Sequence, residues 1–298
     1  MRMRRLTATA AAITLALALA ACGDDDEDTA TSDNSSSPSG DASPSASAAS
    51  GTLGRLQDSG KIVIGVKFDQ PGVGEKDPAT GELSGFDIAI AKLIAEKLGI
   101  DSGDIEFKET VSANREPFLK AGTVDLVIAS YSITDARREV VSQAGPYYET
   151  GQQLLVRKDE AEINGPDDLS GKKVCSVTGS TSIATVKDKY GAEPAPFSTY
   201  TECVQQLINE SVDAVTTDGA ILLGYASKQP DKLKVVGDPF SQERYGIGFA
   251  FGDTQMCEFL RDTLQEAFDD GSWAKAFADT LGKSGVSAPE KPTLDDKC

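Results

Sequence analysis

Short apolar runs alternate with amphipathic segments along most of the chain. The first such series predicts three buried strands and two helices, with strands at 61–66, 105–109 and 124–129 and helices at 86–98 and 117–121. Strands that are separated by helices usually pair in parallel, with helices on both faces of the sheet. The pattern therefore predicts an α/β fold.

The alternation starts again after a strand pattern at 151–159. This second series predicts further strands at 172–177, 212–217, 233–237 and 245–252, and helices at 179–191, 202–211, 254–271 and 272–282. Two similar strand–helix units joined by strand-like segments predict two lobes with a cleft between them. Ligands of open α/β sheets bind beyond the carboxyl ends of the strands.

The N-terminal residues follow a different pattern. Arginines precede an apolar stretch of about 16 residues, Leu6–Ala21, which is shorter than the roughly 20 residues of a membrane span and is typical of a secretory signal. Small residues before Cys22 resemble a lipobox, whose cysteine is acylated. We therefore expect a lipoprotein signal peptide at 1–21 and lipid on Cys22 that holds the protein at the extracellular face of the cell membrane. An ordinary signal with a chance cysteine is the alternative.

The segment 22–52 is acidic and rich in serine, without aromatic or large aliphatic side chains. Such a segment buries too little apolar surface to offset its ordering entropy, so we expect the lipidated cysteine to be followed by a disordered tether. For the rest of the chain we expect lobe 1 at 53–156 and 245–298, and lobe 2 at 157–244.

Charge and composition exclude several kinds of protein. The net charge is −18, with 47 acidic and 29 basic residues, which argues against binding to nucleic acids or anionic lipids. Because the chain has no histidine, Ser-His-Asp triads and His-based zinc sites are excluded. We expect no metal and no cofactor, and enzyme hypotheses are weakened.

Four cysteines follow Cys22, and an even number in an exported chain suggests two disulfides with three possible pairings. Cys175–Cys203 and Cys257–Cys298 are favoured because each pair then stays within one lobe. Four free buried thiols are the alternative.

Polar residues follow several predicted strands, where the cleft is expected. An α-amino acid needs a cation for its carboxylate and an acid for its ammonium, because either charge is costly to bury unpaired. A helix start also favours an anion. The residues at these strand ends that match such a ligand are Lys67, Ser112, Arg115, Ser130, Ser132, Arg137, Thr178, Gly179, Thr181 and Asp218.

The chain resembles the extracellular solute-binding proteins of polar amino acid ABC importers, and among them the actinobacterial glutamate-binding lipoproteins. The resemblance spans about 53–281 and is carried by GELSGFDIAIAKLIAEKLG, VSANREPFLKAGTVDLVIASYSITDARREVVSQAGPYY, GKKVCSVTGSTS, VDAVTTD and YGIGFAFGD. It implies a periplasmic-binding-protein-like type II fold, in which two α/β lobes are joined by two hinge strands. A disulfide like Cys175–Cys203 also occurs in similar proteins.

The resemblance also implies ligand roles by position. Arg137 is expected to clamp the α-carboxylate, Asp218 to accept the ammonium and Arg115 to reach a side-chain carboxylate. Further contacts are implied for Ser112, Ser130, Ser132, Thr178, Gly179 and Thr181, and for Lys67, where some relatives have arginine. The implied ligand is L-glutamate, with aspartate possible, and the implied partners are the permease and ATPase of an importer. A monomer is expected.

Two other functions stay open. A receptor that signals external amino acid to a membrane partner would have the same sequence features. An enzyme on the same fold, similar to certain dehydratases, would need a general acid or base, for which the cleft offers Asp69, Glu116 and Asp218.

Overall fold

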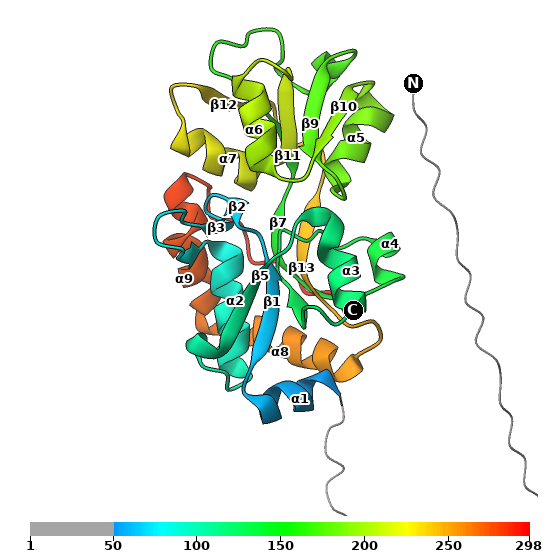
Figure 1. Ribbon diagram of the computed structural model, residues 1–298, viewed down its shortest axis with the longest axis vertical. Helices are drawn as coiled ribbons and strands as arrows, with labels where there is room; N and C mark the ends of the chain where they lie inside the picture. The colour runs from blue at the N-terminus through cyan, green and yellow to red at the C-terminus, as the bar shows by residue number, and fades with distance from the viewer. Residues whose placement is uncertain (1–50) are drawn as a thin grey trace, which may run out of the picture. The chain divides into compact units, whose positions relative to one another are not determined.

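The computed structural model describes residues 51–298 (Figure 1). The expected signal peptide, the lipid site at Cys22 and the tether up to residue 50 lie outside the described residues. Helix α1 (Thr52–Ser59) already begins at Thr52, which we had assigned to the tether. Within residues 51–298, no helix has the length and apolar character needed to cross a membrane.

The first lobe is built on a mixed five-stranded sheet with the order β5-β1-β6-β13-β7. Its strands are β1 (Ile62–Val66), β5 (Ile105–Glu109), β6 (Leu126–Val127), β7 (Ser142–Thr150) and β13 (Glu243–Phe249). Strand β1 is parallel to β5 and β6, whereas β13 is antiparallel to β6 and β7. A small sheet beside it contains β2 (Asp69–Gln70), β3 (Gly74–Lys76) and β4 (Leu83–Ser84).

The helices of the first lobe come from both the N-terminal and the C-terminal parts of the described chain. Besides α1 they are α2 (Phe86–Lys97), α3 (Arg115–Lys120), α4 (Asp135–Arg138), α8 (Thr254–Asp270) and α9 (Ser272–Asp279), with 3-10 turns η1 (Ser102–Asp104), η2 (Ser112–Asn114) and η4 (Leu281–Ser284). Aromatic rings join α2, β7 and α9, because Phe86 packs edge-on against Tyr148, Trp273 and Phe277. All four side chains belong to the buried core.

The second lobe has its own five-stranded sheet, with the order β10-β9-β11-β8-β12. Its elements are β8 (Gln152–Arg157), β9 (Lys173–Val177), β10 (Glu193–Phe197), β11 (Ala214–Asp218), β12 (Leu233–Val236), α5 (Thr181–Tyr190), α6 (Tyr200–Ile208), α7 (Gly219–Lys228) and η3 (Pro166–Leu169). Strand β10 contains two prolines and lies at an edge, where a missing backbone donor is tolerated. The two-lobed α/β type II fold is thus confirmed.

The crossings between the lobes differ from the expected boundaries. Strand β8 pairs with β11 and β12 from Gln152 onward, and β13 pairs with β7 from Glu243 onward. The chain therefore changes lobe at Gly151 and again between 237 and 242, so the expected boundaries at 156/157 and 244/245 fall inside strands. The apolar pattern of 151–159 reveals a strand but not the sheet with which it pairs.

Both expected disulfides are present. Cys175 of β9 is bonded to Cys203 of α6, within the second lobe. Cys257 of α8 is bonded to Cys298, within the first lobe. Each lobe therefore carries one covalent cross-link, and no disulfide joins the two lobes among the described residues.

Candidate ligand site between the lobes

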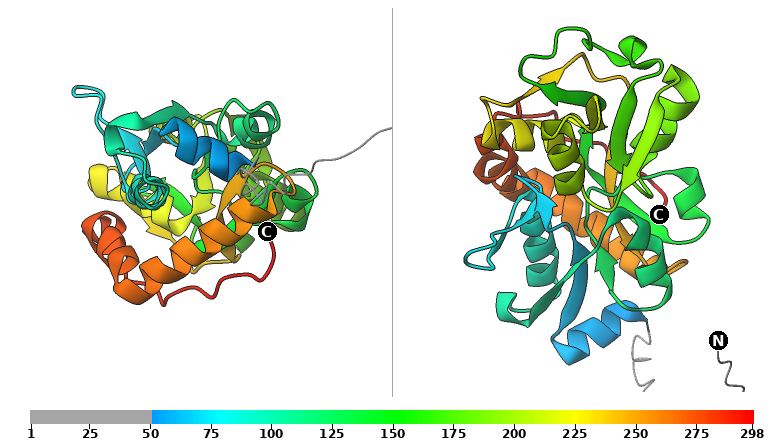
Figure 2. Two further views of the ribbon diagram at one scale, coloured as in Figure 1. Left: turned by 90° about the horizontal axis from the view of Figure 1, so that it is seen from below. Right: turned by 45° about the horizontal axis from the view of Figure 1, so that its top comes forward.

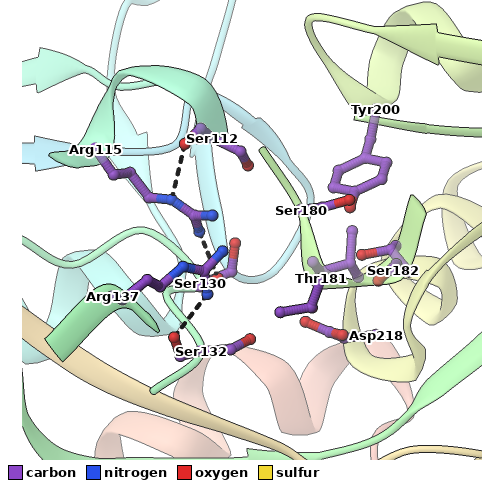
Figure 3. Close-up of a pocket in the computed structure, with 12 residues that line it drawn as sticks. Ser112, Arg115, Ser130, Ser132, Arg137, Ser180, Thr181, Ser182, Tyr200 and Asp218 are labelled. Atoms are coloured by element: carbon purple, nitrogen blue, oxygen red, sulfur yellow. Dashed lines mark hydrogen bonds between the residues drawn. The ribbon is translucent and has the colours of Figure 1, made fainter. Parts of the chain in front are cut away.

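A polar pocket lies where the carboxyl ends of strands from both sheets meet (Figure 3). Its lining residues are Ser112, Arg115, Ser130, Ser132, Arg137, Ser180, Thr181, Ser182, Tyr200, Thr217, Asp218 and Ile221. Figure 3 shows the two arginines on one side of the pocket and Asp218 on the opposite side. The structure thus brings most of the sequence-predicted ligand residues together.

Arg137 is buried near the end of the four-residue helix α4. Its Nε lies 3.2 Å from Glu116 Oε1, and its two terminal nitrogens donate to the carbonyls of Ser132 (2.6 Å) and Gly179 (3.0 Å). The guanidinium also lies 4.9 Å from the ring centre of Tyr131. Its position is therefore fixed from several directions, and one of its acceptors comes from the other lobe.

Arg115 is buried at the start of α3, and its guanidinium lies 4.5 Å from the ring centre of Tyr131, the ring that Arg137 also approaches. Its Nε donates to the Ser112 carbonyl (3.1 Å), and its terminal nitrogens donate to the carbonyls of Ala129, Ser130 and Gly179. Burial lowers the pKa of Arg115 to about 10, with a further contribution from the charge of Arg137.

Lys67 stands behind this pair rather than in the pocket lining. Its Nζ donates to Ser112 Oγ at 2.8 Å, and only 4% of the residue is exposed. Burial lowers the pKa of Lys67 to about 7, and the neighbouring charge of Arg115 contributes to the shift. The two guanidinium groups, with the partly charged Lys67 near them, therefore give one wall of the pocket a positive potential that favours an anion.

Asp87 was not predicted from the sequence as part of the site. It lies in the first turn of α2, fully buried, and accepts hydrogen bonds from the Ser130 N–H and the Tyr147 hydroxyl, both at 2.7 Å. Burial raises the pKa of Asp87 to about 6. Ser130 has φ +44°, a conformation that is unusual for a residue other than glycine, so Asp87 holds the start of the ligand loop in a strained shape.

Asp218 is buried at the end of β11, in the opposite wall. Its Oδ2 accepts from the Tyr245 hydroxyl at 2.5 Å, whereas its buried Oδ1 has no hydrogen-bond partner among the described residues. Burial raises the pKa of Asp218 to about 7, and the nearby carboxylate of Glu243 adds to the rise. Such an unpaired oxygen is costly to bury, which makes it a natural acceptor for a ligand cation.

The start of α5 provides the rest of the second-lobe wall. Ser180 caps this helix by accepting from the Ile183 N–H at 3.3 Å, and the Thr181 hydroxyl donates to Glu243 at 3.1 Å. Thr181 was among the predicted ligand residues, and its neighbours Ser180 and Ser182 at the same predicted helix start also line the pocket. Their position in the first turn of a predicted helix was an available signal, because polar groups there face the cleft.

Two of the predicted ligand residues, Thr178 and Gly179, do not line the pocket. The Thr178 side chain is exposed, and its N–H donates to the carbonyl of Phe197 at 2.9 Å. Gly179 is not part of the lining, yet its carbonyl accepts from both pocket arginines. Tyr200, Thr217 and Ile221 line the pocket without having been predicted.

Comparison with known proteins gives a consistent picture. Residues 62–283 match the family described as bacterial extracellular solute-binding proteins, family 3. The chain is 38% identical over 244 residues to the glutamate-binding protein GluB of Corynebacterium efficiens, covering 78% of this chain and 83% of that protein. It is 37% identical over 228 residues to the ABC transporter glutamine-binding protein GlnH of Bacillus subtilis, covering 76% of this chain and 83% of GlnH.

A solved structure is similar along nearly its whole length. An ancestral arginine-binding protein bound to glutamine superimposes with a TM-score of 0.70 at 37% identity, covering 75% of this chain and 98% of that one. The fold is thus shared with a protein whose structure was solved with bound glutamine.

Proposed function

The chain belongs to the bacterial extracellular solute-binding proteins of family 3, and we propose that it is the receptor of an ABC importer, binding L-glutamate between its lobes and delivering it to the permease. The observation that carries the proposal is the charge arrangement of the pocket. Arg115 and Arg137 stand on one side, with Lys67 behind them, and the unpaired oxygen of Asp218 stands on the other.

This arrangement suits a zwitterion that carries a second carboxylate. The α-carboxylate would take the terminal nitrogen of Arg137 that now donates to Gly179, since an anionic acceptor forms the stronger hydrogen bond. The ligand ammonium would pair with Asp218 Oδ1. The γ-carboxylate would lie toward Arg115, where Lys67 adds positive potential. Aspartate carries the same charges on a shorter side chain.

Relatives named for glutamate and for glutamine are almost equally similar to this chain, so ancestry alone does not choose between the two ligands. The cationic wall favours glutamate, because a neutral amide gains little from the nearby positive charges of Arg115 and Arg137. Titration calorimetry on the purified protein should therefore show glutamate binding more tightly than glutamine.

Arg115→Ala should reduce this preference by about 1.5–3 kcal/mol through loss of a charge-assisted hydrogen bond, and Arg137→Ala should abolish binding of both amino acids. Arg55→Ala is a suitable control, since the Arg55 side chain is 58% exposed on α1. Equal affinity of the unaltered protein for glutamine would contradict the proposal.

The carboxylates that an enzyme would need are mostly engaged elsewhere. Glu116 is paired with Arg137 and accepts from the Tyr131 hydroxyl, and Asp69 accepts from the start of α6. This supports a receptor rather than a dehydratase-like enzyme. Turnover of a prephenate-like acid by the purified protein would contradict it.

We also propose that the protein acts as a monomer held at the extracellular face of the membrane by lipid on Cys22. The acidic segment that follows Cys22 would then serve as a tether. A signalling receptor remains the second candidate, and loss of glutamate uptake in a strain that lacks the chain would favour import.

A further inference from the structure

The last residues of the chain lie outside the family match, which ends at 283. We call residues 285–298 the strap, because they contain no helix or strand and run alongside α8 in the opposite direction (Figure 2). Three contacts mark their course: Lys291 with Asp269 (3.0 Å), Arg261 with Asp296 (3.6 Å) and the Cys257–Cys298 disulfide.

At its end the strap bonds to β7, which is one of the strands that lead between the lobes. The Asp295 N–H donates to the Gly145 carbonyl at 2.7 Å, and the Gln143 N–H donates to the Cys298 carbonyl at 3.0 Å. The Gln143 side chain in turn donates to the Ser132 carbonyl at 3.2 Å. A single residue, Gln143, therefore bridges the strap and the pocket loop that carries Ser130, Ser132 and Arg137.

The Asp295 carboxylate joins two arginines on either side of this loop. Its Oδ2 accepts from Arg138 at 3.0 Å, and its Oδ1 accepts from Arg244 at 2.5 Å. Arg138 is the neighbour of Arg137 in α4, and the Arg244 carbonyl accepts from the Ile133 N–H at 2.7 Å. Asp295 thus connects α4, at the end of the loop 130–137, with β13, whose Arg244 holds the middle of this loop through Ile133.

This connection matters because α4 has only four residues. A single helical turn is not stable by itself and depends on tertiary contacts. Arg138 supplies such contacts, since its terminal nitrogen also donates to the carbonyls of Gln143 (2.9 Å) and Lys297 (3.0 Å).

We infer that the strap, closed by Cys257–Cys298, is a positioning element for the amino acid clamp and that Asp295 is its central positioning residue. The inference rests on the proposed function, because it assigns the strap to the same pocket. Asp295 acts through Arg138 and Arg244 on the loop 130–137 and does not line the pocket.

The test is a matched pair of variants in the full chain. Asp295→Asn places an amide nitrogen, which cannot accept, against one of the two guanidinium groups. Asp296→Asn is the control, because the Asp296 side chain is fully exposed and its 3.6 Å ion pair with Arg261 lies in water, where such pairs contribute little. We expect Asp295→Asn to weaken glutamate binding about tenfold in calorimetry, as for loss of one charge-assisted contact, and Asp296→Asn to leave it unchanged.

Hydrogen–deuterium exchange without ligand separates positioning from general destabilisation. In Asp295→Asn, exchange should rise at 130–137 while β8–β12 of the second lobe keep their protection. The double variant Cys257→Ser/Cys298→Ser should produce the same local rise. Unchanged exchange at 130–137 in both variants, or equal affinity of Asp295→Asn and Asp296→Asn, would overturn the inference.

Failure of the proposed function would look different. In that case the unaltered protein would not bind glutamate. The exchange experiment uses no ligand, so its result does not depend on the proposed function.

Discussion

One backbone carbonyl oxygen, that of Gly179, connects the two walls of the pocket. The Gly179 carbonyl accepts from both pocket arginines, so one peptide group of the second lobe faces two buried cations of the first. Gly179 has φ +84°, and a Cβ there would lie 2.9 Å from both the Cα and the N of Ala113. Because those are backbone atoms, a side chain at 179 would keep the lobes apart.

Gly179→Ala should therefore weaken glutamate binding by about 1–3 kcal/mol, the usual cost of an overpacked contact. Gly171→Ala is the matched control: it has a similar φ of +69° in the same lobe, with nothing within 4 Å of the added carbon. Calorimetry and thermal unfolding of both variants separate the two effects. Equal losses of affinity would show that backbone strain, rather than contact between the lobes, is responsible.

The pocket charges predict a maximum of glutamate affinity near pH 7. Glutamate binding favours ionised Asp218, whose pKa is raised to about 7 by burial. Affinity should therefore fall as the pH drops below this value. A ligand γ-carboxylate favours charged Lys67, whose pKa is lowered to about 7, so affinity should also fall as the pH rises above it.

Each flank should approach about tenfold per pH unit at most for one linked proton. Calorimetry from pH 5 to 9 measures the profile, and Lys67→Met should remove the alkaline flank while keeping the acid one. A profile that is flat between these limits would contradict the assigned roles of Asp218 and Lys67.

Among the elements, the start of α6 forms a second contact between the lobes. Its own capping box, Thr199 with Glu202, leaves the N–H groups of Tyr200 and Thr201 free for other acceptors. Asp69, from β2 of the first lobe, accepts from both, at 2.8 and 3.4 Å. The Tyr225 hydroxyl also donates to the Asp69 carbonyl. A helix terminus of one lobe is thus capped by a side chain of the other.

Asp69→Ala should speed glutamate release, because this cap forms only when the lobes touch. Loss of a cap is worth about 0.5–2 kcal/mol, which corresponds to about 2- to 30-fold in the dissociation rate measured by stopped flow. Glu202→Ala removes the cap supplied by the same lobe and should instead lower the unfolding temperature. If Asp69→Ala lowers the unfolding temperature of the free protein and leaves release unchanged, the contact is merely structural.

The sequence predicted elements well where one local pattern was sufficient. Strands β1, β5 and β9 and helices α2, α8 and α9 lie where apolar periodicity placed them. The pattern missed β7, because its nine residues mix glycine, proline and polar groups and become buried only through tertiary packing. It also missed Tyr200, whose place in the pocket depends on how α6 is oriented over β9.

The same limit applies to the ligand residues. Arg115, Arg137 and Asp218 follow strands and are found in the pocket. Asp87 acts through Ser130, 43 residues away, which no local pattern reveals, and Asp69 was expected in the cleft but its partner at the start of α6 was not.

At the scale of the folded part as a whole, the two lobes are joined by only two crossings, at Gly151 and at 237–242. Each lobe has its own disulfide, so internal rearrangement of either lobe is restrained. A movement of the lobes apart would therefore fall on these crossings, and it would break the contacts of Gly179 and Asp69 together.

A receptor that closes on its ligand must still reach a permease, and for this we proposed lipid on Cys22. Cys22→Ser removes the thiol that would carry the lipid, without altering any residue of the cleft. We expect the variant protein in the culture medium rather than the membrane fraction, with unchanged glutamate affinity after purification.

Uptake of labelled glutamate by cells that contain only this variant should fall most at low external glutamate, because anchoring keeps the receptor at a high effective concentration beside the permease. Adding purified variant protein to the medium should restore uptake in proportion to its concentration. Unaltered uptake by the variant cells would mean that delivery does not depend on Cys22. Unaltered uptake in cells without the chain would instead favour a signalling role, since a sensor changes the response to glutamate and not its entry.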